Sequence, residues 1–135
     1  EKAIIDAVNT EHPDIIIVEG QGGLSHPAFN SSAAIIKGSN PDAIIIQHPP
    51  KRKSRCDFPT IPMPVLKSEI ELNEVFSKSK VIAITINDEN MTGAELEKTI
   101  TEYEDRYKLP VTNVLKYGCN KIIKKIYEVF PEILK

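Results

Sequence analysis

Three short aliphatic runs constrain the fold of this chain more than any other feature. They occupy residues 14–19 (DIIIVE), 42–48 (DAIIIQH) and 80–87 (KVIAITIN). None of them alternates apolar and polar residues, as a strand with one face in water would. We therefore interpret all three as strands that are buried on both faces, the arrangement typical of a parallel sheet.

Helical patterns separate these strands along the chain. We expect helices over residues 1–11, 30–38, 68–79, 92–108 and 118–130, and a fourth strand over 110–115. Two capping boxes support this assignment, Ser68 with Glu71 and Thr92 with Glu95. The proline-rich stretch after the second strand excludes a helix interior or a central strand. The pattern predicts an α/β fold, a mainly parallel sheet with helices on both faces.

Length and composition place the chain among globular proteins. Its 135 residues are 41% hydrophobic and 27% charged, with a net charge of −2, which fits a single α/β domain over 1–135. This balance favours neither nucleic acid nor an anionic membrane as a partner. No apolar run approaches the ~20 residues of a membrane span. Cys56 and Cys119 are far apart, so we expect free thiols and a cytoplasmic protein.

Polar residues follow the predicted strands, where ligands bind in open parallel sheets. Glu19 ends the first aliphatic run and is a candidate general base or, in its other interpretation, a ligand of Mg²⁺. A purely local loop acid is the structural alternative. The loop that follows lets backbone approach a ligand closely because glycines lack a Cβ atom. Its candidate ligand-binding residues are Gly20, Gln21, Gly22 and Gly23.

A hydroxyl and two imidazoles accompany this loop. Ser25 and His26 are adjacent, and adjacent side chains rarely face each other, so a nucleophile–base pair is disfavoured. We interpret Ser25 as a substrate hydrogen-bonding group and His26 as an acid–base or ligand-binding residue. His48 ends the second strand and is a further catalytic candidate, with a strand-end cap as its alternative. No histidine spacing matches a zinc site.

A basic run and an asparagine complete the candidate site. Lys51, Arg52 and Arg55 are candidate phosphate-binding residues, with a solvated loop as the alternative, and Asn87 follows the third strand. A GxxxxGK[ST] phosphate loop is absent from the sequence. We therefore expect the chain to be the C-terminal part of a longer protein, whose missing N-terminal part carries the phosphate-loop strand.

The motifs DIIIVEGQGGLSHPAF, GSNPDAIIIQHPPKR, VIAITIN and LPVTNVLKYG resemble the D-glutamate N-acetyltransferase family, long catalogued as a domain of unknown function. The family's usual first motif is close to VEGQGSLSHP, so Gly23 replaces a serine here. The resemblance implies a P-loop NTPase-like fold, acetyl-CoA, an amino-acid substrate, and an N-terminal domain in the same protein. A homo-oligomer is our further expectation.

A second resemblance keeps another function open. An aliphatic strand that ends in Glu19 and glycines is similar to dethiobiotin synthetase and the cobyrinic acid amidating synthetases. That resemblance implies ATP and Mg²⁺, with the acid near the metal and Asn87 near the nucleotide base. A non-catalytic regulatory or assembly domain is the third alternative.

Overall fold

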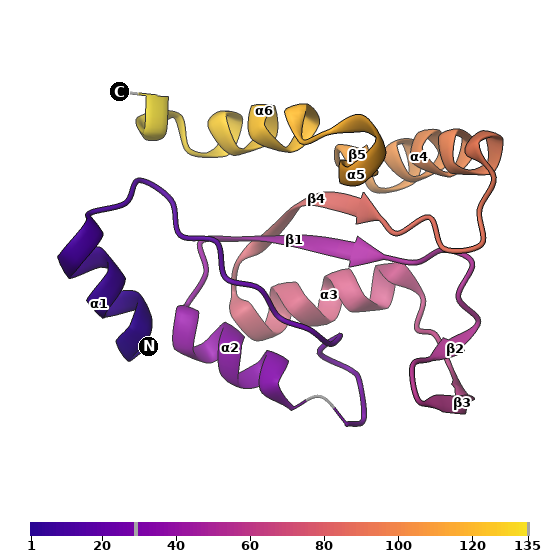
Figure 1. Cartoon of the computed structure of the whole chain (residues 1–135), viewed down its shortest axis with the longest axis horizontal. Coiled ribbons are helices and arrows are strands. Elements are labelled where there is room, and N and C mark those ends of the chain that lie inside the picture. The colour runs from indigo at the N-terminus through magenta and orange to yellow at the C-terminus, as the bar shows by residue number, and fades with distance from the viewer. Residues whose placement is uncertain (29, 135) are drawn as a thin grey trace.

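A three-stranded parallel sheet forms the centre of the molecule (Figure 1). The computed structural model describes residues 1–28 and 30–134. The strands are β1 (Ala43–His48), β4 (Lys80–Ile86) and β5 (Val111–Thr112), in the order β1-β4-β5. Both neighbouring pairs are parallel. The α/β prediction and the second and third predicted strands are thus confirmed.

Helices cover the two faces of this sheet. Figure 1 shows α2 and α3 on one side of the sheet and α4 and α6 on the other. The helices are α1 (Lys2–Glu11), α2 (Ser31–Ser39), α3 (Leu66–Ser77), α4 (Gly93–Tyr107), α5 (Val114–Tyr117) and α6 (Asn120–Val129), followed by the 3₁₀ turn η1 (Pro131–Leu134). Each long predicted helix is present within a few residues of its expected bounds.

The core lies around the central strand β4. Ile84 is fully buried, and so are Val111 of β5 and Leu96 of α4. Partly buried side chains from α4 surround them, among them Tyr103 and Tyr107. The helical spacing of Leu96, Ile100, Tyr103 and Tyr107 predicts an apolar stripe on α4, and all four side chains belong to the core or pack against it. Because β4 has a strand on each side and helices above and below, its aliphatic sequence is buried almost throughout.

Of the two capping boxes that the sequence predicts, one is present. Thr92 and Glu95 form the predicted capping box at the start of α4. The capping box predicted at Ser68 is wrong, because α3 already begins at Leu66 and the Ser68 hydroxyl donates to the carbonyl of Val65 at 2.7 Å. A capping residue precedes the first turn of the helix, and its side chain accepts hydrogen bonds from the N–H groups of that turn. Ser68 lies inside the first turn of α3.

The predicted strand over residues 14–19 is wrong. This segment has no regular secondary structure, and within the described part of the chain it makes no backbone hydrogen bond to the sheet. Its aliphatic side chains are exposed, and Ile17 is 89% accessible to solvent. An aliphatic run becomes a strand only when it pairs in register with a neighbour, and among the described residues none pairs with this run.

Three smaller expectations also change. The strand predicted over 110–115 is only Val111–Thr112. Asn113 ends it, because its side chain accepts a hydrogen bond from the N–H of Lys116 at 3.0 Å and caps the start of α5.

The proline-rich loop contains an antiparallel hairpin, β2 (Ser54–Arg55) with β3 (Phe58–Pro62), which the sequence did not predict. The sequence spacing also predicts that Ile122, Ile123, Ile126, Tyr127 and Phe130 of the last helix face inward. Ile122 is buried, but Ile123 and Tyr127 are exposed. Cys56 and Cys119 are free thiols.

The contrast between Ile84 and Ile17 gives a test of this fold. Replacing Ile84 by alanine should lower the free energy of unfolding by roughly 2–5 kcal/mol, since the site is fully buried. The same change at Ile17 should stay within about 0.5 kcal/mol, because that side chain is 89% exposed. Urea unfolding measures both, and comparable losses would show that residues 14–19 are packed.

Candidate functional site

The carboxyl ends of β1 and β4 lie side by side, as the sequence predicted. The register pairs His48 with Ile86, and the N–H of Asn87 donates to the carbonyl of His48 at 2.9 Å. The Asn87 side chain accepts a hydrogen bond from the N–H of Glu89 at 3.0 Å. Two of the predicted site residues are thus neighbours at one edge of the sheet, and one of them also shapes the turn that follows β4.

His48 is half-buried at this edge. Its ring lies 6.0 Å from the ring of Tyr103 on α4, measured between centroids. Burial lowers the pKa of His48 below 6.5, because the charged imidazolium loses hydration there. The imidazole is therefore neutral near pH 7 and has a nitrogen that can accept a proton.

Two ion pairs connect the loop after β1 to the segment after β4. Lys51 binds Glu95, and Arg52 binds Glu89 with both Nε and Nη2. The Lys51 ammonium and the N–H and hydroxyl of Thr92 hold the pKa of Glu95 at about 2. All four side chains are substantially exposed, and such pairs contribute little stability. Exchanging these carboxylates for an anionic ligand would therefore cost little stability.

Arg55 has a different environment from the other two basic residues. It belongs to β2, and its guanidinium donates to the hydroxyl of Ser25 and lies 3.9 Å from the carboxylate of Glu69 on α3. The Ser25 hydroxyl in turn donates to Glu69. The Arg55 and Glu69 side chains are only 9% and 12% exposed. We call this arrangement the buried clasp: the buried Arg55 and Glu69 side chains together with the exposed Ser25, which bonds to both. It joins the glycine loop, the hairpin and α3.

The glycine loop lies directly against the buried clasp. A Cβ atom added at Gly23 would be 3.3 Å from the Glu69 carboxylate and 3.8 Å from the Arg55 guanidinium. A serine here, as in the usual family motif, would require the neighbouring carboxylate to move slightly. On the other side of the loop, the Ser32 hydroxyl of α2 donates to the carbonyl of Gly22. Contacts from two helices therefore position this loop.

His26 faces the hairpin. Its ring packs edge-on against Phe58 of β3, with ring centroids 5.6 Å apart, and its Nδ1 accepts the N–H of Ala28 at 3.2 Å. Glu19, Gly20 and Gln21 precede the clasp and are exposed. The catalytic roles of Glu19, His26 and His48 stay predictions.

Other chemical features can be stated briefly. Within residues 1–28 and 30–134, no group of three His, Cys, Asp or Glu side chains is arranged to hold a metal ion. The Mg²⁺ role of Glu19 therefore stays a prediction without further ligands. Among the described helices, none is both long and apolar enough to cross a membrane.

Glu69 is the residue that sequence reasoning missed. It lies between ordinary helical residues and follows no motif, so nothing local marks it. Its partners are far away in sequence, Ser25 by 44 positions. A buried carboxylate is conspicuous only in three dimensions, since burial of an ion without a partner is costly.

With this geometry in place, the family described as "Domain of unknown function (DUF1611_C) P-loop domain" matches residues 1–123. The chain belongs to this family. A solved DUF1611 family protein from Anabaena variabilis has the same fold, with a TM-score of 0.86 and 22% sequence identity over 94% of this chain and 38% of that one. The P-loop NTPase-like α/β fold is thereby established.

Two curated relatives carry the name D-glutamate N-acetyltransferase. The protein from Pseudoalteromonas is 28% identical over 82% of this DUF1611 chain and 35% of its own length. The protein from Tritonibacter scottomollicae is 27% identical over 88% of this chain and 37% of its own length. The chain thus spans little more than a third of the curated relatives it matches.

The buried clasp predicts unequal effects for two identical substitutions. Glu69→Gln leaves Arg55 buried without a counter-charge and should lower the free energy of unfolding by on the order of 3 kcal/mol. Glu89→Gln removes the exposed partner of Arg52 and should cost less than about 1 kcal/mol. Denaturant unfolding of the two variants measures the difference. Equal costs would mean that the clasp is solvated.

The lowered pKa of His48 predicts a specific pH dependence. Below pH 6.5 the unfolded chain takes up a proton at this residue before the folded chain does, so stability should fall as the pH drops through that value. His48→Gln should remove this part of the loss. Thermal unfolding between pH 8 and 5.5 measures it, and identical pH profiles for the two proteins would contradict burial of the imidazole.

Proposed function

We propose that this chain is the C-terminal part of an N-acetyltransferase that acts on the amino group of an amino acid such as D-glutamate. The observation that carries the proposal is the shared name of two relatives that align with 82% and 88% of the chain. The carboxyl edge of the sheet supports it, because it offers a neutral imidazole at the end of β1 and two solvent-accessible cations in the loop that follows.

The first chemical requirement is a neutral amine. An ammonium group has no lone pair, so a base must take its proton before nitrogen can attack a carbonyl carbon. His48 suits this role because its imidazole is neutral near pH 7. Glu19 is exposed at the start of the glycine loop and is the second candidate.

The second requirement is a binding site for the acyl donor. Acetyl-CoA supplies a thioester carbonyl that is open to nucleophilic attack, and it carries phosphates. Lys51 and Arg52 suit these phosphates, because their present partners are exposed carboxylates and exchange readily. Arg55 does not suit them, since it is held in the buried clasp. We therefore assign Arg55 to positioning the glycine loop.

The third requirement is stabilisation of negative charge on the carbonyl oxygen. Backbone N–H groups of residues 20–23 are suitable donors, because glycines leave them accessible. The clasp and the Ser32 hydroxyl fix the loop on both sides, so these donors need little reorganisation when a ligand binds. Gln21 and Ser25 lie in the same loop, and Ser25 reaches a ligand only if it leaves Glu69.

Ligand titration of the full-length protein tests the proposal. Acetyl-CoA should bind with Lys51 and Arg52 contributing, so that Lys51→Ala with Arg52→Ala weakens binding by roughly 10-fold or more. The matched control is Lys67→Ala with Lys98→Ala, two lysines in exposed helical ion pairs. Tight ATP binding without acetyl-CoA binding would favour an ATP-dependent ligase and contradict acetyl transfer.

Removal of the charge at residue 19 tests the proposed base. In the full-length enzyme, Glu19→Gln should lower turnover by roughly 10²-fold, the usual scale for loss of a general base. Folding should be unchanged, because Glu19 is exposed. Glu11→Gln, the same change at an exposed acid that ends α1, is the control. Wild-type turnover in Glu19→Gln would assign the base to His48.

A further inference from the structure

The imidazole of His48 is not oriented by a hydrogen bond. Its backbone carbonyl accepts the N–H of Asn87, but within residues 1–28 and 30–134 neither ring nitrogen is bonded to another residue. A histidine that moves protons usually has one ring nitrogen bonded to a carbonyl or carboxylate, which sets its tautomer and direction. Another contact must therefore hold this ring in place.

The aromatic ring of Tyr103 provides that contact. The two ring centroids are 6.0 Å apart and the ring planes are inclined by 39°. His48 shares a face of β1 with Ile46, because side chains two residues apart on a strand point to the same side. Ile46 and Tyr103 both pack against the core cluster that contains Ile84. The imidazole thus meets α4 on the side of β1 that faces the core.

Tyr103 is itself fixed by its neighbours on α4. Tyr107, one helical turn later, packs edge-on against it, with ring centroids 5.4 Å apart and planes 86° apart. The helix starts at the capping box of Thr92 and Glu95, and its middle packs on the core. A side chain on such a rigid element keeps its place within the narrow tolerance that a site requires.

Burial, rather than a nearby charge, governs the protonation of His48. Burial is what lowers the pKa of its imidazole. Burial also raises the pKa of Tyr103, which is therefore a neutral phenol near pH 7. The charged groups on the surrounding elements act on other partners: Lys51 on Glu95, Arg52 on Glu89, Arg55 on Glu69, and Arg106 and Glu102 on Tyr103. The side chain that covers the imidazole thus has the largest influence on it.

We propose that Tyr103 is a positioning residue for His48: its ring orients the imidazole and keeps water from one side of it, so that a ring nitrogen can accept the proton of the substrate amine. This inference rests on the proposed function, in which His48 is a candidate base. Tyr103 acts through His48 and need not touch the substrate. Its hydroxyl is dispensable, because the contact is made by the ring.

An NMR titration of the full-length protein tests the contact without any substrate. Ring-labelled histidine reports the pKa of each imidazole, and the signal that is missing in His48→Gln identifies His48. Tyr103→Leu keeps an apolar side chain on α4 but removes the ring, so the pKa of His48 should rise toward its ordinary value of 6.5. Tyr103→Phe keeps the ring and should leave this pKa unchanged. An unmoved pKa in Tyr103→Leu, or a shifted one in Tyr103→Phe, would overturn the inference.

Turnover separates this inference from the proposed function. In a protein that transfers acetyl groups, Tyr103→Leu should lower kcat by roughly 10- to 100-fold with KM nearly unchanged, because a displaced base slows the chemistry without weakening binding. Tyr103→Phe should keep the wild-type kcat. Wild-type turnover in His48→Gln or in Tyr103→Leu would overturn the inference while acetyl transfer stands. Without any acetyl transfer the proposed function fails, and the NMR titration alone decides whether Tyr103 controls His48.

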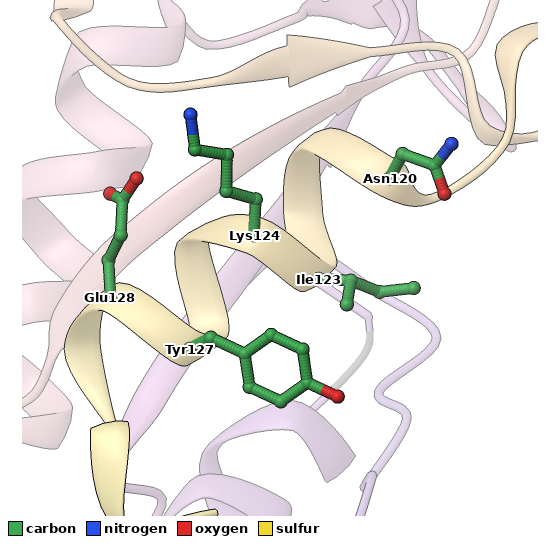
Figure 2. A pocket seen from close by; sticks show the side chains of 5 residues that line it. All are labelled: Asn120, Ile123, Lys124, Tyr127 and Glu128. Atoms are coloured by element: carbon green, nitrogen blue, oxygen red, sulfur yellow. The ribbon is translucent and has the colours of Figure 1, made fainter. Parts of the chain in front are cut away.

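Tyr127 provides the matched control. Figure 2 shows its ring projecting from α6 on the same side as Ile123, and the residue is 39% exposed. Tyr127→Leu should therefore change neither the pKa of His48 nor kcat. Equal effects of Tyr127→Leu and Tyr103→Leu would trace both to a general loss of packing and would overturn the inference.

Discussion

The parallel ladder between β1 and β4 is the interaction on which the rest of the structure depends. Its register pairs His48 with Ile86 and thereby brings Asn87 to the end of β1. The loops that leave the two strands then run close enough for Lys51 and Arg52 to reach acids beyond β4. A shift of one residue would turn every side chain of β1 to the other face and separate these groups.

Charge is used in two ways around this sheet edge. Lys51 and Arg52 form exposed pairs that contribute little stability and exchange readily, which suits ligand binding. Arg55 and Glu69 are buried and depend on each other, so they fix the glycine loop rather than respond to ligand. In the sequence, Lys51, Arg52 and Arg55 belong to one basic run. Only their surroundings distinguish Lys51 and Arg52, which suit ligand binding, from Arg55, which holds the glycine loop in place.

Much of the fold could be predicted because its signals are local. Aliphatic runs without alternation predicted β1 and β4, and the capping box at Thr92 marked the start of α4. Residues 14–19 have the same kind of sequence and form no strand, because pairing depends on a neighbour that the run itself does not encode. The hairpin was missed for a related reason, since prolines exclude a central strand but permit an isolated pair.

The sequence by itself determined the fold class, the parallel direction of the strands and the edge at which polar residues gather, because these follow from side-chain period and strand ends. Only the tertiary structure decided which of those residues meet. It placed His48 against Tyr103, where burial lowers its pKa, and it joined Ser25 and Arg55 through Glu69, a residue without any motif. Contacts between residues far apart in sequence, and the solvent they exclude, are properties of packing and have no local pattern.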